Sequence, residues 1–424
     1  MTPPMTDLKL IEPRGPLTIR VRPPGSKSIT NRALLIAALA EGESRLENPL
    51  RSDDTVAMCA CLKTLGSRIV DEGDNLVISG GPFHRAETPL DVNLSGTALR
   101  FLVAAASLVP GGATVDGRPR IRERPIRPLT DAMNELGVNV SVDSQTGGAP
   151  VVVGGGELRG GVVRMAASAS SQPVSALMMV APFATGPIRI EFLGGQSISA
   201  SYLRTTAEVM TAFGLEPELA VDHVVVPTGR YRPLTYAIEA DASAAVYAWC
   251  AAAISGGEAV VTGIGPGSSQ ADLGVLAALA AMGCAVEVGS GEITVRAPEL
   301  LTGITMDLGQ CPDGAMAIAV CAAFAAGPSR LTGLSSWAVK ETDRLAAVST
   351  ELAKLGVGVV ATRDSLSIDP PSFMVPTEIR TYDDHRMAMA FSLAGLRVPG
   401  VRIADPEVVS KTWPGYWEEF ATWR

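Results

Sequence analysis

Histidine is scarce in this sequence, and cysteine is not arranged for metal binding. The 424 residues include only three histidines, and the six cysteines form no Cys-x-x-Cys pair and no Cys/His cluster with metal-ligand spacing. Because transition metals in proteins are bound mainly by clustered His and Cys side chains, we expect no metal site. Most of the cysteines lie among alanine, leucine and valine, which predicts reduced thiols in a cytosolic protein core.

An excess of positive charge is also missing. The chain has 35 Lys and Arg against 44 Asp and Glu, a net charge of −9, with a pI of about 5.1. Nucleic-acid-binding proteins usually carry a basic face, so this balance argues against a nucleic-acid partner. If the ligands are anions, the positive charge must be concentrated locally.

Long apolar runs are absent too. The longest run of small apolar residues, 314–327, falls short of the ~20 residues that span a bilayer, so we expect no membrane partner. Residues 1–15 contain three prolines, two acidic residues and no apolar core, so we expect no signal peptide. With 47% apolar residues the chain can bury more than one core, and its length predicts two or three domains in a cytoplasmic protein.

The sequence does contain an internal repeat. An alanine-rich, helix-like stretch that ends on glycine recurs six times, about 70 to 74 residues apart. Between these stretches a second one ends on an apolar residue plus glycine, as in Leu65-Gly66, and β-branched or alternating residues follow. Glycine stops helices because it adopts the left-handed conformation without strain. Each repeat therefore predicts helix, strand, helix, strand, strand, with the alanine-rich helices buried. The six closing glycines are Gly42, Gly112, Gly186, Gly257, Gly327 and Gly400.

A first candidate anion site lies in residues 24–32, at the start of a predicted helix. Gly25 and the N–H groups of a helix start can cradle an anion. Lys27, Ser28 and Arg32 add side-chain donors. A serine-capped helix with a few surface charges is the alternative. An NTPase phosphate loop is disfavoured, because it needs lysine directly after its last glycine and another glycine five residues earlier.

Two further segments of the first half continue this theme. Gly96, at the start of another predicted helix, would allow close backbone approach by a ligand. Five arginines then share a loop with three prolines, which indicates a stiff loop that addresses an anion, although a solvated run of charges is an equal alternative. These arginines are Arg118, Arg120, Arg122, Arg124 and Arg127.

Neutral donors follow before the next apolar helix. Ser170, Ser171 and Gln172 precede that helix, and Ser199 and Tyr202 lie in the following segment. Helix capping accounts for one of the serines but not for all of them. Hydroxyl groups beside helix N–H groups suit a phosphate or a polyol.

The second half of the chain holds carboxylates with basic neighbours. Asp313 precedes an apolar helix, where the helix dipole favours a negative charge. Arg344 and Arg386 are each suited to a bidentate grip on a carboxylate. Taken singly such charges are more often solvated ion pairs, but they occupy similar places in successive repeats, which favours one site for anionic ligands. The other members of the set are Lys340, Glu341 and Lys411.

Taken in order, these motifs resemble the 5-enolpyruvylshikimate-3-phosphate synthase family over nearly the whole chain. Each motif is weak alone, but the ordered set is specific. The motifs are residues 24–32, 95–100, 123–126, 170–172, 241–243, 312–313, 340–344, 384–387 and 405–412.

The resemblance implies an α/β (α+β) fold with two similar domains. Each domain would contain three repeated βαβαββ units with buried parallel helices and outer sheets, an inside-out α/β barrel. One domain would comprise residues 1–22 plus 239–424 and the other residues 23–238, with the active site in the cleft between them. Closure of the domains on the substrates would exclude water.

The resemblance also implies two small-molecule substrates and no cofactor. Phosphoenolpyruvate would be bound by Lys27, Gly96, Arg124, Gln172, Arg344, Arg386 and Lys411. Shikimate 3-phosphate would be bound by Lys27, Ser28, Arg32, Ser170, Ser171, Gln172, Ser199, Tyr202, Asp313 and Lys340. The residues with catalytic roles would be Lys27, Asp313, Glu341 and Lys411.

The implied chemistry is addition followed by elimination, which needs a base for a hydroxyl and an acid for a carbon. Asp313 would be the base and Glu341 the proton donor to the methylene carbon, while Lys27 would assist the leaving phosphate. Gly96 would leave room beside phosphoenolpyruvate, so we expect competitive inhibition by glyphosate. Leu94, Phe101 and Ser336 depart from the residues frequent in the family.

Two alternatives remain open at this point. The sister family that transfers enolpyruvate to UDP-N-acetylglucosamine usually has a cysteine on its mobile loop, and residues 111–128 contain none. A non-catalytic paralogue that only binds anions would be expected to lose Lys27, Asp313 or Glu341, and all three are present. We expect a monomer, since no coiled coil or long apolar stripe is evident.

Overall fold

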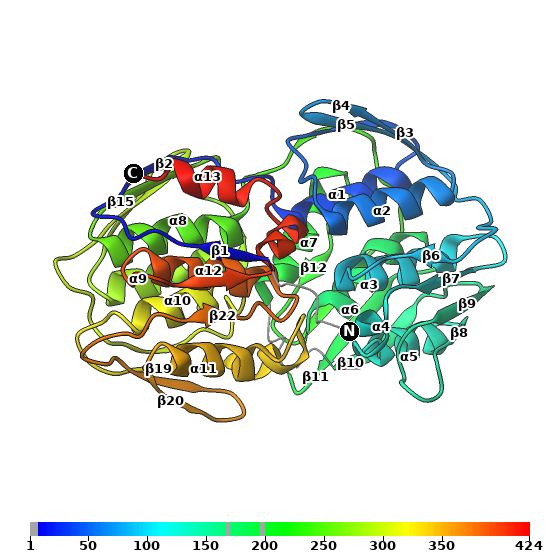
Figure 1. The fold of residues 1–424 in the computed structure, drawn as a ribbon. Coiled ribbons are helices and arrows are strands. Elements are labelled where there is room, and N and C mark those ends of the chain that lie inside the picture. Colours follow the sequence, from blue (N-terminus) through cyan, green and yellow to red (C-terminus); the bar gives the residue numbers. More distant parts are fainter. Residues whose placement is uncertain (1–6, 167–169, 196–199) are drawn as a thin grey trace. The chain divides into compact units, whose positions relative to one another are not determined.

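The computed structural model describes residues 7–166, 170–195 and 200–424. Contacts within the chain divide it into two compact units, unit 1 with residues 1–24 and 240–424 and unit 2 with residues 25–239 (Figure 1). Each unit has a hydrophobic core of its own, and the two cores share no residue. The units are therefore described one at a time.

Three four-stranded sheets form the β-structure among the described residues of unit 2. In each sheet the first two strands run parallel, and the third and fourth are each antiparallel to the strand before them. Inward and outward residues alternate, as in β8 and β11, because successive side chains of a strand point to opposite faces. The sheets are β14 (Thr235–Ala237), β3 (Gly42–Glu47), β5 (Asn75–Gly80) and β4 (Arg68–Glu72); β6 (Leu90–Asp91), β7 (Ala113–Asp116), β9 (Val151–Gly156) and β8 (Val138–Ser141); and β10 (Gly161–Ala166), β11 (Ile188–Leu193), β13 (His223–Val226) and β12 (Glu218–Leu219).

Three apolar helices of unit 2 pack against one another: α1 (Lys27–Leu39), α3 (Gly96–Ala105) and α6 (Gln172–Val180). They are buried almost all round, as their alanine- and leucine-rich sequences predict. Their first residues, Lys27, Gly96 and Gln172, are three of the candidate site residues. The remaining helices are α2 (Asp53–Thr64), α4 (Pro119–Arg122), α5 (Arg127–Glu135) and α7 (Ala200–Ala212), with 3-10 turns η1 (Ala106–Leu108) and η2 (Ala181–Phe183).

Unit 1 contains two four-stranded sheets of the same pairing scheme and one three-stranded sheet among its described residues. Strands from residues 8–21 enter two of these sheets, so the start of the chain is built into the unit formed by its second half. The sheets are β2 (Thr18–Val21), β15 (Glu258–Thr262), β17 (Glu292–Arg296) and β16 (Ala285–Val288); β18 (Thr305–Asp307), β19 (Ser329–Thr332), β21 (Leu366–Asp369) and β20 (Gly358–Ala361); and β1 (Leu8–Leu10), β23 (Arg402–Ala404) and β22 (Glu378–Ile379).

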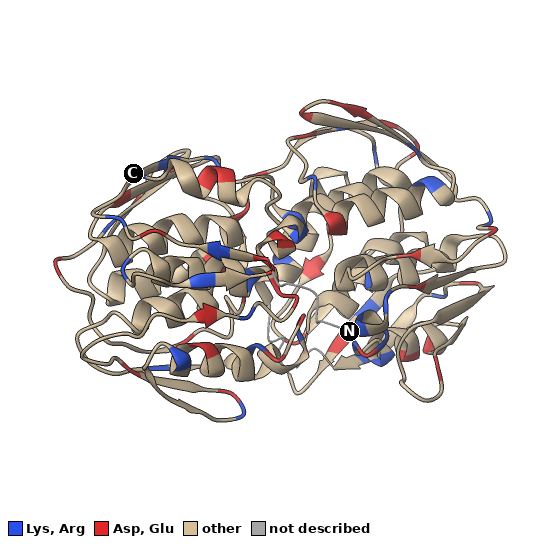
Figure 2. Cartoon of the chain, viewed as in Figure 1, with Lys and Arg blue, Asp and Glu red and all other residues tan. Residues whose placement is uncertain are grey.

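Three buried helices also pack together in unit 1: α8 (Ala242–Ser255), α10 (Ala315–Ala322) and α12 (His385–Gly395). An aspartate lies immediately before α8 and α12 and two residues before α10, and the middles of all three helices carry no charge (Figure 2). The remaining helices are α9 (Val275–Ala281), α11 (Arg344–Lys354) and α13 (Tyr416–Thr422), with 3-10 turns η3 (Ala271–Gly274), η4 (Leu334–Val339) and η5 (Pro406–Lys411).

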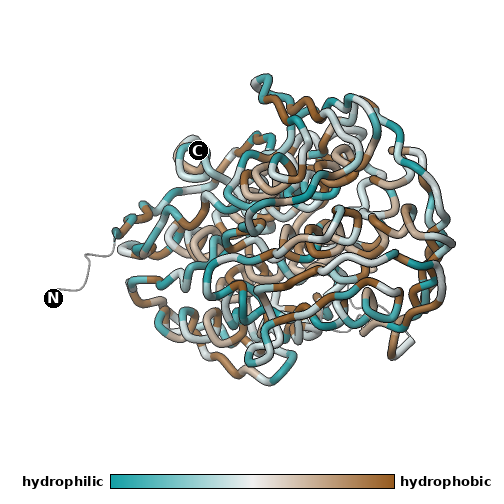
Figure 3. Tube along the Cα trace, turned by 90° about the vertical axis from the view of Figure 1, so that its right-hand side faces the viewer, coloured by the Kyte–Doolittle hydropathy of each residue, from teal (hydrophilic) through white to brown (hydrophobic). Residues whose placement is uncertain are grey.

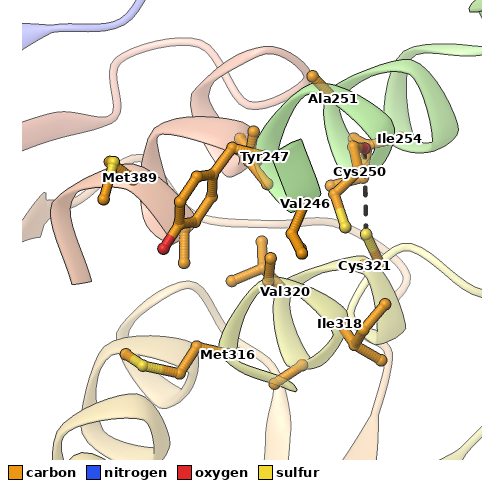
Figure 4. Close-up of a cluster of buried hydrophobic side chains, with 14 of the residues drawn as sticks. Val246, Tyr247, Cys250, Ala251, Ile254, Met316, Ile318, Val320, Cys321 and Met389 are labelled. Carbon is orange, nitrogen blue, oxygen red and sulfur yellow. Dashed lines mark hydrogen bonds between the residues drawn. The ribbon is translucent and has the colours of Figure 1, made fainter. Parts of the chain in front are cut away.

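Small and sulfur-containing side chains fill the contact between these helices. Figure 4 shows Val246 and Cys250 of α8 facing Val320 and Cys321 of α10, with the Cys321 Sγ 4.0 Å from the Cys250 carbonyl oxygen. All six cysteines of the chain are free, and all but Cys59 are buried. Apolar and hydrophilic stretches alternate along the trace (Figure 3). Within the part of the chain that the structure describes, no helix has both the length and the apolar character of a membrane span.

Candidate functional site

Lys27 opens helix α1 in unit 2. Its Nζ lies 3.4 Å from the Asp54 carboxylate, and both side chains are largely buried. The preceding turn is tightly packed, because a Cβ at Gly25 would collide with the Asn48 carbonyl oxygen. Glycine is therefore required at this position, and its small size lets the chain turn directly into the helix that presents Lys27.

Arg32 lies one turn further along α1, and its guanidinium is buried. The group donates from Nε to Thr206 Oγ1 at 2.7 Å and from Nη1 to the Ser28 carbonyl oxygen at 2.9 Å. Its carbon lies 5.3 Å from the ring centre of Phe101, one of the departures from the family pattern. Burial lowers the pKa of Arg32 to about 10. Arg32 thus ties α1 to α3 and α7 of the same unit.

Gly96 begins helix α3 against two arginines. A Cβ at Gly96 would lie 2.6 Å from Arg124 Cζ and 3.0 Å from Arg100 Nη1. Arg100 donates to the Gly96 carbonyl oxygen at 2.8 Å and to Gln172 Oε1 at 3.0 Å, and Gln172 Nε2 donates to Thr97 Oγ1 at 3.1 Å. The starts of α3 and α6 are therefore joined, and the Arg124 guanidinium occupies the space that a side chain at Gly96 would need.

The arginine-rich segment splits into two kinds of residue. Arg122 forms a bidentate pair with Asp116, at 3.0 and 2.6 Å, and Arg120 pairs with Glu123. These side chains are exposed or nearly so, which matches the solvated charges that were left open as an alternative. Arg124, by contrast, is 9% exposed. It is the arginine of this segment that contacts the start of a buried helix.

The predicted serine cluster is described only in part. Ser170 Oγ accepts a hydrogen bond from the Gln172 N–H at 3.2 Å, and Ser171 is the residue before α6. Tyr202 lies in α7, and its carbonyl oxygen accepts from Thr206 at 2.8 Å. Ser199 lies outside the described residues.

Asp313 is the centre of a second cluster, in unit 1. Its Oδ1 lies 2.7 Å from Arg344 Nη1 and 3.3 Å from Lys340 Nζ, and its Oδ2 lies 3.0 Å from Arg386 Nη2. Burial acts to raise the pKa of Asp313, but Arg386, Lys340 and Arg344 outweigh it and hold that pKa well below its usual range. One carboxylate is therefore shared by three cations.

Arg344 and Arg386 stand at the starts of α11 and α12. Arg344 contacts three carboxylates: Asp384 through Nε at 2.7 Å, Asp313, and Glu341 through Nη2 at 2.8 Å. Arg386 Nη1 lies 3.4 Å from Tyr247 Oη, and its buried Nε makes no hydrogen bond within the described structure. Burial acts to lower the pKa of both guanidinium groups, but the neighbouring acidic groups raise it above the ordinary arginine value. Both groups therefore stay charged.

Glu341 links this cluster to the end of the chain. Its Oε2 faces Arg344, and its Oε1 lies 3.5 Å from Lys411 Nζ at the end of η5. A carboxylate between an arginine and a lysine thus lies close to a second carboxylate, Asp313, that is held by the same arginine. Such a pair of acids in different surroundings can divide the roles of base and acid.

Two carboxylates of this cluster were absent from the predicted site set. Asp384 is fully buried, and its two carboxylate oxygens accept hydrogen bonds from Arg344. Its position just before α12 was visible in the sequence. Asp272 accepts hydrogen bonds from the Gly314 N–H and from the Ser243 hydroxyl. A single acidic residue in an ordinary sequence gave no signal for Asp272, since its partners lie about 30 to 40 residues away. Among the described residues no group of His, Cys, Asp and Glu is arranged to hold a metal ion.

Solved structures with the same architecture identify the fold. The EPSP synthase from Acinetobacter baumannii superposes with a TM-score of 0.83 over 98% of this chain and 98% of that chain, at 23% identity. The enolpyruvyl transferase NikO from Streptomyces tendae gives 0.80 over 98% and 97%, at 20% identity. This chain therefore has the mixed α/β fold of the enolpyruvyl transferases.

Sequence comparison identifies the family within that class. The family model of EPSP synthase (3-phosphoshikimate 1-carboxyvinyltransferase) matches residues 11–420. Relatives named 3-phosphoshikimate 1-carboxyvinyltransferase include one from Sulfurovum sp., 44% identical over 93% of this chain and 94% of the relative, and one from Shewanella amazonensis, 42% identical over 98% and 99%. The chain belongs to the EPSP synthase family.

Proposed function

We propose that this chain transfers the enolpyruvyl group of phosphoenolpyruvate to the 5-hydroxyl of shikimate 3-phosphate, releasing phosphate. Family membership supports the reaction. The observation that carries it is the cluster around Asp313, where two arginines and a lysine surround one carboxylate and a second carboxylate, Glu341, lies beside them. This arrangement offers anion-binding groups next to a base and an acid.

The proposed substrate contacts are divided between the units. Phosphoenolpyruvate is met by Lys27, Gly96, Arg124 and Gln172 of unit 2 and by Arg344, Arg386 and Lys411 of unit 1. Arg344 and Arg386 hold its carboxylate, because a bidentate guanidinium suits that group. The proposed contacts of shikimate 3-phosphate are Lys27, Ser28, Arg32, Ser170, Ser171, Gln172, Ser199, Tyr202, Asp313 and Lys340.

The arginines are prepared for such a ligand. Arg386 Nε is buried without a hydrogen-bond partner in the described structure, and leaving such a donor unpaired costs about 1–3 kcal/mol. A substrate carboxylate between Arg344 and Arg386 would supply the missing acceptor. It would also compete with Asp313 for the guanidinium groups, which frees that carboxylate to act on the substrate.

The proton steps follow from these positions. Asp313 takes the proton of the 5-hydroxyl while the hydroxyl oxygen bonds to C2 of phosphoenolpyruvate, and protonated Glu341 delivers a proton to C3. In the second step the C2–O bond to phosphate breaks, the Glu341 carboxylate takes a proton back from C3 and the double bond returns. The proton held by Asp313 passes to the departing phosphate, so both carboxyl groups end as they began. Lys27 and Lys411 stabilise the negative charge on the departing phosphate. C2 and C3 end at their original oxidation states, so the two steps need no oxidant or reductant.

The finer architecture and the working state of the protein are part of this proposal. We take each unit to consist of three βαβαββ repeats arranged as an inside-out barrel, and we place the active site in the cleft between the two units. The shared strand order of five sheets supports the repeat. We further propose that the protein is cytoplasmic, which the six free cysteines support. We also propose that it is a monomer, and light scattering of the purified protein tests this.

Phosphate release from phosphoenolpyruvate tests the function. We expect release with shikimate 3-phosphate and none with UDP-N-acetylglucosamine, and we expect Lys27→Ala and Asp313→Asn each to remove most of it, by about 10²-fold or more. Since one residue belongs to unit 2 and the other to unit 1, loss in both variants supports a site built from both units. A folded wild-type protein that releases no phosphate would overturn the proposal.

A further inference from the structure

The backbone of Asp313 is held on both sides by buried side chains. The Pro312 carbonyl oxygen accepts a hydrogen bond from Trp337 Nε1 at 2.7 Å, and the Gly314 N–H donates to Asp272 Oδ1 at 2.9 Å. These two atoms belong to the peptide groups immediately before and after the Asp313 Cα. Because peptide groups are planar, fixing both of them fixes the backbone dihedrals of Asp313 and the direction in which its side chain leaves the chain.

The two side chains that hold Asp313 are themselves rigidly placed. Trp337 is fully buried in η4, and Asp272 is 1% exposed in η3. Asp272 Oδ2 accepts from the Ser243 hydroxyl of α8, so each of its oxygens has a donor. Gly314 is equally confined, because a Cβ there would lie 2.5 Å from Val275 Cγ1.

We infer that Asp272 and Trp337 are positioning residues for the Asp313 carboxylate, acting through the Gly314 N–H and the Pro312 carbonyl. The inference rests on the proposed function, in which Asp313 is the base. A displacement of about 1 Å between a base and its substrate can cost on the order of 10²-fold in rate, so a fixed backbone at this residue has a direct consequence for turnover.

The bond to the Gly314 N–H does not require a charge at position 272. A neutral amide oxygen could accept this N–H equally well, whereas an apolar side chain would leave the Gly314 N–H without its acceptor. The positioning role therefore depends on an oxygen at this position and not on its charge.

The charged groups that face Asp313 come from several elements. Lys340 and Glu341 follow η4, Arg344 begins α11, Arg386 begins α12, and Asp272 lies in η3. The cations lower the pKa of Asp313, and Glu341 opposes them. Substitution of Asp272 leaves the three ion pairs of Asp313, with Lys340, Arg344 and Arg386, in place.

The backbone contact is tested with Trp337→Phe, which keeps an aromatic ring and removes the N–H. Trp249→Phe is the matched control, because Trp249 is equally buried in unit 1 and donates to the Ile293 carbonyl oxygen at 3.3 Å, away from Asp313. We expect both variants to lower the urea midpoint to a similar extent. Only Trp337→Phe should lower kcat, by about 10- to 100-fold, with the KM for phosphoenolpyruvate little changed. Equal kcat values in the two variants would overturn the role of Trp337.

The Asp272 contact is tested with Asp272→Leu, which removes the acceptor of the Gly314 N–H, and with Asp272→Asn, which keeps an amide oxygen in its place. We expect Asp272→Leu to lower kcat by about 10- to 100-fold with the KM for phosphoenolpyruvate little changed, and we expect Asp272→Asn to restore most of the loss. Equal kcat values in the two variants would overturn the role of Asp272. Asp313→Asn tests the proposed function separately. If it is inactive while Asp272→Leu and Trp337→Phe both match Trp249→Phe in kcat, the function stands and the positioning role does not.

Discussion

Because Gly96 has no side chain, the Arg124 guanidinium can lie in the space that a Cβ at this position would occupy. Alanine there would press against the Arg124 guanidinium and approach Arg100 Nη1 to 3.0 Å. We expect Gly96→Ala to raise the KM for phosphoenolpyruvate and the Ki for glyphosate by about tenfold or more, ~1.4 kcal/mol each, because it displaces Arg124, which we propose as a phosphoenolpyruvate contact and expect glyphosate to share. Steady-state kinetics measure both constants. Gly267→Ala, where nothing lies within 4 Å of the added carbon, should match the wild type.

Two neighbouring aspartates should affect stability in opposite directions. The folded-state pKa of Asp313 lies below its ordinary value, so its contribution to stability is present at neutral pH and is lost as the pH falls through that lower pKa. The folded-state pKa of Asp272 is raised, so its ionisation costs stability as the pH rises above ~3.9, the ordinary aspartate value. We expect Asp313→Asn to lose about 3 kcal/mol at pH 7.

Asp272→Asn should lose none of the free energy of unfolding at that pH, and its stability should depend less on pH. Urea titrations between about pH 2 and 8, a range on both sides of the ordinary carboxylate pKa of ~3.9, measure both variants. A large loss in Asp272→Asn would contradict the expectation. The resemblance of the Pro312-Asp313 motif to the family predicted a role for Asp313, but nothing in the sequence pointed to Asp272, whose significance arises only from contacts with Ser243 and Gly314.

At the scale of elements, the local glycine pattern predicted where helices end. Glycines 66, 137, 214, 283 and 356 all follow a helix with positive φ, between 89° and 101°. The glycines that end the alanine-rich stretches were predicted less accurately. The left-handed residue after α8 is Gly256 rather than Gly257, and Gly186 does not have positive φ. Which strands pair could not be predicted, since partners such as β2 and β15 lie more than 200 residues apart.

Helix α11 holds the strained turn that precedes α12. Tyr382 and Asp383 both have φ of 55°, and Glu351 accepts from Tyr382 Oη at 2.7 Å, from the Arg380 N–H at 3.2 Å and from Lys354 Nζ at 2.6 Å. We expect Glu351→Ala to destabilise the protein by about 3 kcal/mol, because it removes the buried carboxylate that three part-buried donors share and releases the turn. Urea unfolding measures the change. Thr350→Ala, on the exposed side of the same helix, should cost less than about 1 kcal/mol.

For the whole molecule, the separate cores predict separate folding. Unit 2 is one continuous segment, residues 25–239, whereas the core of unit 1 draws on Ile11, Leu17 and Ile19 as well as on the second half of the chain. We expect a fragment of residues 25–239 to unfold cooperatively by circular dichroism. A fragment of residues 240–424 should do so only when a peptide covering residues 7–24 is added. Cooperative unfolding of the second fragment alone would contradict this expectation.

The discontinuity of unit 1 also matters while the protein is being made. Strand β1 leaves the ribosome long before its partner β23, since Leu8 pairs with Ala404. At about 5–20 residues per second, the wait is on the order of 20–80 s. During that time the apolar residues of the leading segment have no core to enter, while unit 2 can already fold behind them. During this part of translation the nascent chain exposes an apolar segment whose strand partner has not been synthesised. We expect a chaperone to bind this segment.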